Sequence, residues 1–481
     1  MITFKNLLTE GAKENAALDY LQKLVQTGPF RGRVYLAGGA VRDMQLGKDP
    51  KDLDVVVTGE LDAGMEFAKW ATKTMNNYRD GSNPVLFPTY GTAKFTLRGI
   101  THNGFDLSDV DIEAVATRKE KYTTGSRKPE VSAGDLEDDV HRRDFTVNSL
   151  LKDLTTGEIL DFTGKGKDDI RRGVVQTPLN PDVIFTEDPL RMLRAVRFTM
   201  KYGWELPMFM IRALKSNAAQ LQNISAERIR DELDKMLVTD SSDRAIKLLR
   251  ITGLLNYIIP EFKTAYKMTQ NVHHHKRDVF GHTLDVMKGT DPVLLQRLMA
   301  LFHDIGKTVT RSVTPTGVHF YGHEDVGADM TRDIMRRLRY PTELIDAVVS
   351  GVANHMKLKH GGDDAVELSD KTLRKFKIAL GDKLEDVLNV IHADNTAHSE
   401  ASSMPNQIVN VRNRLKGLEA STPSEPKLPI TGKDLIDMGV KPGPIFSKIL
   451  AAVTEKWYEN PNITTQQALH IAKSIANSQS K

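Results

Sequence analysis

The chain has 481 residues and no cysteine, and its 66 Lys and Arg residues against 63 Asp and Glu residues leave a formal net charge of +3. The near balance of charge excludes a surface coated in positive charge, and the lack of cysteine excludes disulfides, thiol catalysis and cysteine-ligated zinc. No apolar run approaches the roughly 20 residues that span a membrane, so we expect a cytoplasmic protein without a membrane partner.

The first motif is VYLAGGAVRDMQLGKDPKDLDVVV, residues 34–57. Two short apolar runs enclose a glycine pair and a helix-compatible segment, which predicts a strand, a tight turn, a short helix and a second strand. Gly38 and Gly39 would let backbone N–H groups approach a triphosphate. Arg42, one helical turn further on, would meet the charge of that triphosphate.

Two aspartates stand at the start of the second predicted strand. Asp52 and Asp54 are two residues apart, so their carboxylates leave the same face of the sheet. Such a pair of hard oxygen ligands suits Mg²⁺, which can clamp the attacking and leaving oxygens of a phosphoryl transfer. Taken alone, the two residues are equally well explained as ordinary turn formers.

GGAVRD followed by DLD resembles the head-domain motif of the class II tRNA nucleotidyltransferase and bacterial poly(A) polymerase family. The resemblance implies an α+β fold, with a nucleotidyltransferase head built on a mixed β-sheet and helical domains after it. Counted back from Arg118, Glu113 falls where the family carries its third acidic catalytic residue. Asp111 stays open as a substitute, because the match depends on the offset.

The stretch DLEDDVHRRDFTVNSL, residues 135–150, is similar to a second family motif over about a dozen positions. Arg143, with Arg142, can form a fork for triphosphate oxygens. Asp144 can accept from a ribose hydroxyl, and Asn148 can reach sugar or phosphate. A charged helix start over a packed core would explain the apolar residues of this stretch but not the paired arginines.

TEDPLRMLRAVRF, residues 186–198, predicts a helix that Thr186 caps and that opens with Glu187, Asp188 and Pro189. Asp188, Arg191 and Arg194 recur at every third position and are expected to share one face. An acid-base ladder on a solvated helix is the alternative. The spacing matches the nucleotide-selecting helix of the family, in which Asp accepts from the amine of C or A while Arg donates to the adjacent ring nitrogen.

Beyond Pro260, helical segments carry histidine and aspartate, and this run resembles the HD phosphohydrolase domain. A lone helical histidine is more often packed core, as we expect of His392 and His398, and the run 273–275 is expected to be a solvated loop or an accessory to the mouth of the site. The residues that match the core metal ligands are His282, His303, Asp304 and Asp394. His323 and His355 match positions that bind a second metal or a phosphate in some members. Imidazole ligands suit Ni, Mn or Co better than Mg.

The resemblance implies four domains: a nucleotidyltransferase head (1–175), a helical neck and body for nucleotide selection and tRNA binding (176–260), an HD domain (261–400), and a linker with a helical tail (401–481). The implied function is template-independent addition of CCA to tRNA 3′ ends from CTP and ATP. The HD domain would add a phosphohydrolase activity on 2′,3′-cyclic phosphates or phosphomonoesters, for repair of blocked ends. Poly(A) polymerase, a CC- or A-adding specialist, and a phosphohydrolase with an RNA-binding-only head stay open, as does the oligomeric state.

Overall fold

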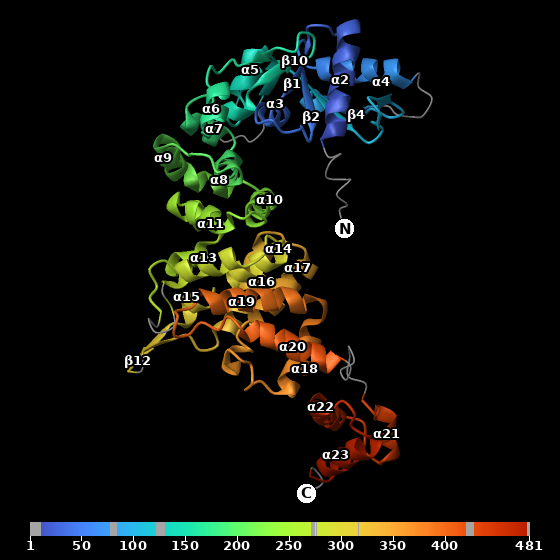
Figure 1. The fold of residues 1–481 in the computed structure, drawn as a ribbon, viewed down its shortest axis with the longest axis vertical. Coiled ribbons are helices and arrows are strands. Elements are labelled where there is room, and N and C mark those ends of the chain that lie inside the picture. Colours follow the sequence, from blue (N-terminus) through green and yellow to red (C-terminus); the bar gives the residue numbers. More distant parts are fainter. Residues whose placement is uncertain are drawn as a thin grey trace. The chain divides into compact units, whose positions relative to one another are not determined.

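The computed structural model describes residues 11–76, 84–121, 130–270, 275, 277–315, 317–419 and 428–478 (Figure 1). They form two compact units, which we call the first unit (Met1–Ser225 with Leu248–Tyr257) and the second unit (Ala226–Lys247 with Ile258–Lys481). The four domain boundaries expected from the sequence stay predictions. Residues 273–274 of the histidine run and 420–427 of the expected linker lie outside the described part.

A seven-stranded mixed sheet lies in the first unit, in the order β11-β10-β1-β2-β7-β4-β3. Its strands are β1 (Val34–Ala37), β2 (Leu53–Val57), β3 (Val85–Phe87), β4 (Thr92–Thr96), β7 (Asp111–Ala116), β10 (Leu151–Asp153) and β11 (Ile159–Leu160). β2 pairs with β7 in parallel, and the other neighbours in this sheet are antiparallel. The predicted mixed sheet is therefore confirmed.

The helices of the first unit cover this sheet and continue beyond it. They are α2 (Ala12–Thr27), α3 (Gly39–Gln45), α4 (Ala63–Asn76), α5 (Leu136–His141), α6 (Gly166–Arg172), α7 (Pro181–Glu187), α8 (Leu190–Tyr202) and α9 (Met208–Asn217). Gly64 lets α4 approach β7 closely, because a Cβ atom at this position would lie 2.7 Å from the carbonyl oxygen of Ala114. Small strands pair outside the main sheet, β5 (Thr101–His102) with β6 (Phe105–Asp106) and β8 (Arg118–Lys121) with β9 (Glu130–Ala133).

The helix expected to be capped by Thr186 begins later, and this detail of the prediction is wrong. Thr186 belongs to the last turn of α7, where its hydroxyl donates to the carbonyl oxygen of Asp182 over 2.7 Å. Asp188 breaks the helix with extended backbone angles, and α8 starts at Leu190. Pro189 lacks an N–H group, which makes a new helix start favourable at this point.

The second unit is helical, as the sequence predicts, with a small hairpin of β12 (Ser312–Thr314) and β13 (Gly317–His319) that the sequence did not reveal. Its helices are α10 (Ala226–Leu237), α13 (Val279–Gly289), α14 (Leu294–Phe302), α15 (Lys307–Thr310), α16 (His323–Arg337), α17 (Thr342–Asn354), α18 (Asp370–Leu380), α19 (Leu384–Ala397) and α20 (Gln407–Glu419). The chain passes between the units three times: just before α10, within α11 (Ser242–Ile251) and within the short α12 (Leu255–Ile258).

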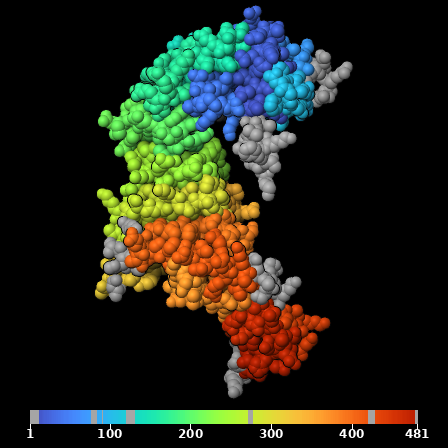
Figure 2. Space-filling model, in the orientation of Figure 1, coloured from blue at the N-terminus to red at the C-terminus, as the bar shows by residue number. Residues whose placement is uncertain are grey.

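The last three helices gather around a core of their own, coloured red in Figures 1 and 2. They are α21 (Gly432–Asp437), α22 (Pro444–Glu459) and α23 (Thr465–Ser478), and Trp457 is the largest side chain buried among them. The predicted helical tail is thus confirmed. Among the described residues, no helix is both long enough and apolar enough to cross a membrane.

Candidate active sites

The acidic residues of the head meet across two parallel strands. The register of β2 and β7 places Asp54 directly opposite Glu113, and Asp52 lies just before the start of β2. Asp111 is the first residue of β7, two residues before Glu113, and forms an ion pair with Lys94 over 2.7 Å. The strand pairing therefore puts Glu113, and not Asp111, beside Asp54.

Asp54 is the carboxylate that this arrangement perturbs most. Partial desolvation by surrounding protein atoms, followed by the charges of Glu113 and Asp52 and opposed by Arg143, raises its pKa to about 6. The side chain is nevertheless exposed, so it is open to a ligand on one side. Clustered anionic oxygens of this kind fit a hard divalent cation such as Mg²⁺, which would relieve their repulsion.

Asp54→Asn should stabilise the metal-free protein at neutral pH. Because the folded pKa is raised, the folded protein holds the proton that the unfolded chain loses between about pH 4 and 6, so ionisation of Asp54 costs stability above that window. After a discount for solvent screening we expect a gain of about 1 kcal/mol at pH 7 and none below pH 4. Thermal melts in EDTA at both pH values measure this difference.

Asp111→Asn is the matched control, because Asp111 is paired with Lys94 and should gain nothing from neutralisation. Equal melting temperatures for wild type and Asp54→Asn at pH 7 would show that the three carboxylates do not repel one another.

The glycine turn before α3 lies against an arginine of the second motif. Gly38 has a φ angle of 70° in the left-handed region, and a Cβ atom there would lie 3.2 Å from Nη1 of Arg143. A side chain at this position would be strained and would crowd the guanidinium. The turn thus leaves room for Arg143 next to the predicted phosphate site.

Asp139 orients both arginines of the second motif, and the sequence interpretation missed it. Its side chain is fully buried and accepts from Arg142 through Oδ1 and from Arg143 through Oδ2, at 2.5 and 2.8 Å. Burial alone would raise the pKa of Asp139, but Arg143 and Arg142 together lower it below its ordinary value. An aspartate in a charged helix start looks solvated in sequence, and only its position four residues before Arg143 hinted at the pairing.

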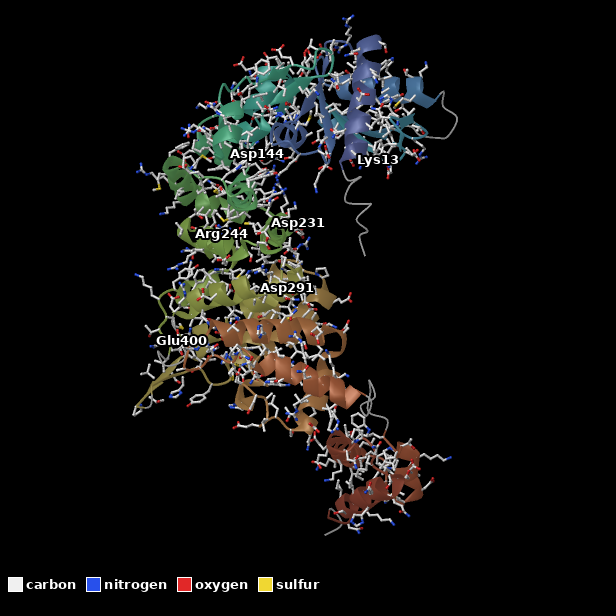
Figure 3. All side chains as sticks on the ribbon, in the orientation of Figure 1. Lys13, Asp144, Asp231, Arg244, Asp291 and Glu400 are labelled. Atoms are coloured by element: carbon white, nitrogen blue, oxygen red, sulfur yellow. The ribbon has the colours of Figure 1, made fainter. Side chains whose placement is uncertain are left out.

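A continuous chain of polar side chains links four other predicted residues. Arg42 donates to Oδ1 of Asn148 over 2.6 Å, and Nδ2 of Asn148 donates to Oδ1 of Asp144 over 2.9 Å. The other oxygen of Asp144, which is labelled in Figure 3, accepts two hydrogen bonds from Arg194 at 2.8 and 2.6 Å. Asp144 and Asn148 are buried, and in this structure their polar groups form hydrogen bonds within this chain of side chains. The chain connects α3 with α8, which carries the predicted base-reading residues.

Arg191 and Asp188 lie at the start of α8. Arg191 is buried and donates to the carbonyl oxygen of Arg142 over 2.5 Å and to Oε2 of Glu187 over 3.3 Å. The carboxylate of Asp188 accepts from the backbone N–H of Leu190 over 3.2 Å. Since Asp188 stands in the break before the helix, the two residues do not share a helical face as predicted, although they remain adjacent at the same helix end.

In the second unit, the six predicted histidine and aspartate ligands converge from separate helices. His282 lies on α13 and Asp394 on α19, with His282 Nε2 2.9 Å from Asp394 Oδ1. His303 and Asp304 follow α14, His323 begins α16 and His355 follows α17. All six are buried. Gly306 permits this approach, because a Cβ atom there would lie 2.1 Å from the carbonyl oxygen of His323.

Three of these imidazoles use Nδ1 for a hydrogen bond to the backbone and leave Nε2 for the site. Nδ1 of His303, His323 and His355 lies 2.8, 2.8 and 2.6 Å from a carbonyl oxygen three residues earlier, which assigns Nδ1 as the donor. Their Nε2 atoms are buried without a hydrogen-bond partner. Burial, followed by repulsion from His303, lowers the pKa of His355 to about 3, so this imidazole is neutral. Oriented and unsatisfied imidazole nitrogens fit a divalent transition metal.

The ligand atoms fall into two groups around Asp304. Oδ2 of Asp304 faces Nε2 of His303 at 3.2 Å, and its Oδ1 faces Nε2 of His323 at 3.3 Å. The groups whose ligand atoms all lie within 4.8 Å are His282 with His303 and Asp394, and Asp304 with His323 and His355. The three head carboxylates do not form such a group among the described residues.

The structure also brings His275 and His398 into this cluster. Their ligand atoms and those of His282 all lie within 4.8 Å of one another, and the His398 ring is mostly buried. The burial of His398 agrees with the expected packing, and its place in this group makes it a further candidate ligand. The accessory role expected of the histidine run stays a prediction. His398 is four residues after Asp394 and so on the same helical face, and this spacing was the signal that could have revealed it.

The fold and these two sites define a nucleotidyltransferase that carries an HD domain. Family models match the chain as "Poly A polymerase head domain" at residues 34–176, "Probable RNA and SrmB- binding site of polymerase A" at 210–266 and "HD domain" at 274–387. The chain is 30% identical to the A-adding tRNA nucleotidyltransferase of Deinococcus radiodurans over 401 residues, which are 76% of this chain and 89% of that protein. The chain belongs to the tRNA nucleotidyltransferase and poly(A) polymerase family.

Relatives with different nucleotide specificities are about equally similar. The CC-adding tRNA nucleotidyltransferase of Thermus thermophilus is 28% identical over 90% of this chain and 91% of its own length. The multifunctional CCA protein of Haemophilus influenzae is 31% identical over 64% of this chain and 71% of its own length. Similarity alone therefore does not select one of these specificities.

Solved structures share the fold at low identity. The Bacillus stearothermophilus CCA-adding enzyme in complex with CTP aligns with a TM-score of 0.63 and 22% identity, over 97% of this chain and 99% of that one. The Thermotoga maritima CCA-adding enzyme in complex with tRNA aligns with a TM-score of 0.57 and 18% identity, over 96% of this chain and 95% of that one. The predicted succession of a mixed-sheet head and helical domains is that of these enzymes.

Proposed function

We propose that the chain adds CCA to the 3′ end of tRNA from CTP and ATP without a nucleic-acid template. The observation that carries the proposal is the pairing of Asp54 with Glu113 across parallel strands, beside Asp52 and close to an arginine held against the glycine turn. CCA-, CC- and A-adding enzymes among the relatives support it. A chain that acts on tRNA would work in the cytoplasm.

Asp52, Asp54 and Glu113 would hold Mg²⁺, which when bound supplies a Lewis acid for the tRNA 3′ hydroxyl and the pyrophosphate leaving group. Attack on the α-phosphate would be in line. Arg143 would position the triphosphate, since Asp139 holds it in place and Gly38 leaves it room. Arg42 would add positive charge near the triphosphate without contacting it directly, because its own side chain is buried and hydrogen-bonded to Asn148.

Asp188 and Arg191 would read the base. C and A present an amine that Asp188 can accept from, whereas G and U present a carbonyl that would face the carboxylate. A mispaired buried polar group costs enough binding energy to reject the wrong nucleotide. One protein pocket can thus choose two of the four nucleotides.

In the HD domain we propose a metal-dependent phosphohydrolase that acts on 2′,3′-cyclic phosphates or phosphomonoesters. His282, His303 and Asp394 would hold one Ni, Mn or Co ion, and His323 with His355 a second ion, with Asp304 shared between them. Such ions supply a bound hydroxide near neutral pH. The three buried imidazole nitrogens without hydrogen-bond partners support this proposal.

The test is incorporation of each nucleoside triphosphate in turn into tRNA that ends at the discriminator base. Two C residues followed by one A are expected. Long A tails on any RNA would identify a poly(A) polymerase, and addition limited to CC or to A would identify a specialist. A chain that adds nothing but hydrolyses phosphate esters would be an HD phosphohydrolase with a head that only binds RNA.

Arg191→Ala should weaken use of CTP and ATP by about 1.5 to 3 kcal/mol, because a buried charged donor is lost. Selection against UTP and GTP should weaken at the same time. Competition between correct and incorrect nucleotides in the incorporation assay measures both effects. Unchanged, sharp selectivity in the variant would show that another pair of residues reads the base.

A further inference from the structure

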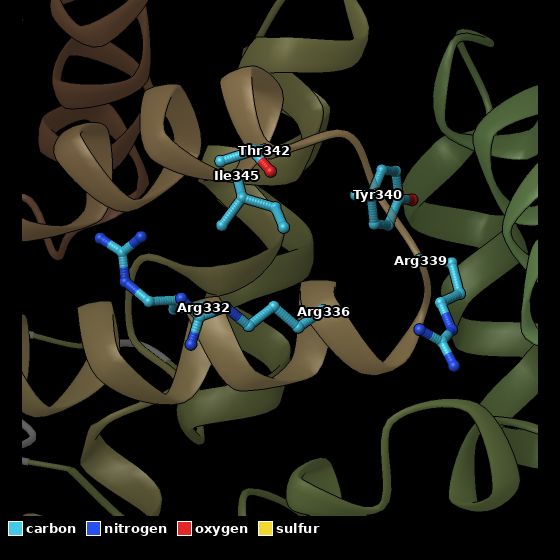
Figure 4. Close-up of a pocket in the computed structure, with 6 residues that line it drawn as sticks. All are labelled: Arg332, Arg336, Arg339, Tyr340, Thr342 and Ile345. Carbon is cyan, nitrogen blue, oxygen red and sulfur yellow. The ribbon is translucent and has the colours of Figure 1, made fainter.

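An open pocket in the second unit is lined mainly by arginines that neither candidate active site uses. It has a volume of about 430 Å³, and its lining residues are Arg332, Arg336, Arg339, Tyr340, Thr342 and Ile345. Arg332 and Arg336 extend from α16, and Arg339 extends from the turn that follows it (Figure 4). We call these three residues the arginine row. We propose that the arginine row binds the phosphate backbone of the RNA substrate.

Two of the three guanidinium groups are available for a ligand. Arg332 pairs with Asp346 over 2.6 Å. Arg336 and Arg339 are exposed, and within the described part of the chain neither side chain forms a hydrogen bond or an ion pair. Residues three or four apart on a helix lie about 5 to 6 Å apart. The row is therefore longer than one phosphate group and suits a chain of phosphates.

Arg339 occupies a backbone conformation that favours glycine. Its φ angle is 61°, which costs a residue with a side chain about 1 kcal/mol or more. The turn is nevertheless well defined, because the backbone N–H of Arg339 donates to the carbonyl oxygen of Arg336 over 3.0 Å and its own carbonyl oxygen accepts from Arg230. An arginine kept where glycine would fit better indicates a use for the guanidinium itself.

The pocket is joined to a helix inside the segment that matches an RNA-binding family model. Arg230 lies on α10, within residues 210–266. On the same helix, Asp234 accepts a hydrogen bond of 2.5 Å from the hydroxyl of Tyr340. The arginine row thus extends the surface of α10 through direct contacts. The inference rests on the proposed function, because it takes the RNA substrate from there.

The composition of the pocket favours RNA backbone over an acidic protein or a base. Tyr340 is buried and hydrogen-bonded to Asp234, so it offers no open face on which a base could stack. Ile345 is also buried, which leaves no exposed apolar anchor of the kind that protein interfaces need at their centre. Guanidinium groups that have neither a stacking surface nor an apolar anchor beside them recognise phosphate groups, whatever the nucleotide sequence.

The test compares tRNA binding by wild type and by the double variant Arg336→Ala with Arg339→Gly, over a range of salt concentrations. Loss of two phosphate contacts should raise the Kd about tenfold and lower the slope of log K against log[salt] by about 2. Arg339→Gly should not lower the melting temperature, because it relieves the left-handed strain. The KM for tRNA in CTP incorporation should rise with little change in kcat.

Two controls separate a specific site from general charge. Arg171→Ala with Lys288→Ala removes two positive charges at exposed positions elsewhere and should leave the Kd nearly unchanged. Arg336→Lys with Arg339→Lys should recover most of the lost affinity, because it restores the charge.

An unchanged Kd and salt slope in the double variant, with a wild type that extends tRNA normally, would overturn this inference alone. An equal loss of binding to polyglutamate would overturn the assignment to RNA, because the pocket would then select any polyanion. A wild type that neither binds nor extends tRNA would overturn the proposed function and this inference with it.

Discussion

Asp52→Ala combined with Asp54→Ala should abolish nucleotide addition while leaving phosphoester hydrolysis unchanged. The two substitutions remove two of the three carboxylates that would hold Mg²⁺, and with them several kcal/mol of transition-state stabilisation. We expect CTP incorporation to fall by about 10³-fold or more. Both side chains are exposed, so their loss should leave the β2 core intact.

The experiment measures CTP incorporation into tRNA that lacks CCA, together with hydrolysis of 2′,3′-cyclic AMP by the same preparation. Asp111→Ala serves as control, because Asp111 is exposed on the adjacent strand and pairs with Lys94. Loss of both activities in a double variant with an unchanged circular dichroism spectrum would mean that one shared centre performs both reactions. Retained CTP incorporation would remove the two aspartates from the catalytic site.

His303→Ala combined with Asp304→Ala should have the opposite effect. These residues contribute to both ligand groups of the HD site, so hydrolysis should fall to the background of the assay. CTP incorporation should stay within about twofold, because the head carboxylates belong to the first unit and use oxygen ligands only. EDTA should remove hydrolysis, and Ni, Mn or Co should restore it better than Mg.

A folding defect is a real risk in this double variant. The ammonium group of Lys307 lies 2.8 Å from Oδ2 of Asp304 and is buried, and a buried charge without its partner costs about 3 to 5 kcal/mol. Two single variants, His355→Gln and His282→Gln, avoid this cost and should lower hydrolysis by about 10²-fold or more. If either variant keeps full hydrolysis, or if any correctly folded HD variant loses CTP incorporation, the separation into two sites is wrong.

Local sequence patterns were sufficient to predict the elements that carry both sites. The apolar runs on either side of Gly38 and Gly39 predicted β1, α3 and β2, because strand and turn signals act over a few residues. Histidines and aspartates near the ends of apolar helices indicated the HD ligands for the same reason. The motif around Arg143 needed a longer match to the family, since paired arginines alone would also fit a solvated helix.

Pairing between distant segments could not be read from these patterns. Whether Asp111 or Glu113 accompanies Asp54 depends on the register of β2 against β7, because both acidic residues point to the same face of β7 and a shift by two residues would exchange them. Asp139 looked solvated until the fold buried it between two arginines. His398, expected to pack in the core, became a candidate ligand as well only because α13 places His282 beside it.

The sequence by itself determined the family and the order of the sheet-containing head and the helical domains, and it predicted the kinds of ligand in each site, because these depend on residue type and local spacing. Tertiary structure decided which side-chain atoms are free to bind a ligand. Nε2 of His303 and His355 faces the site because the Nδ1 atoms are held by carbonyl oxygens of their own helices, and burial keeps water from those nitrogens. Arg336 and Arg339 form one pocket only because the turn after α16 holds a left-handed residue against α10.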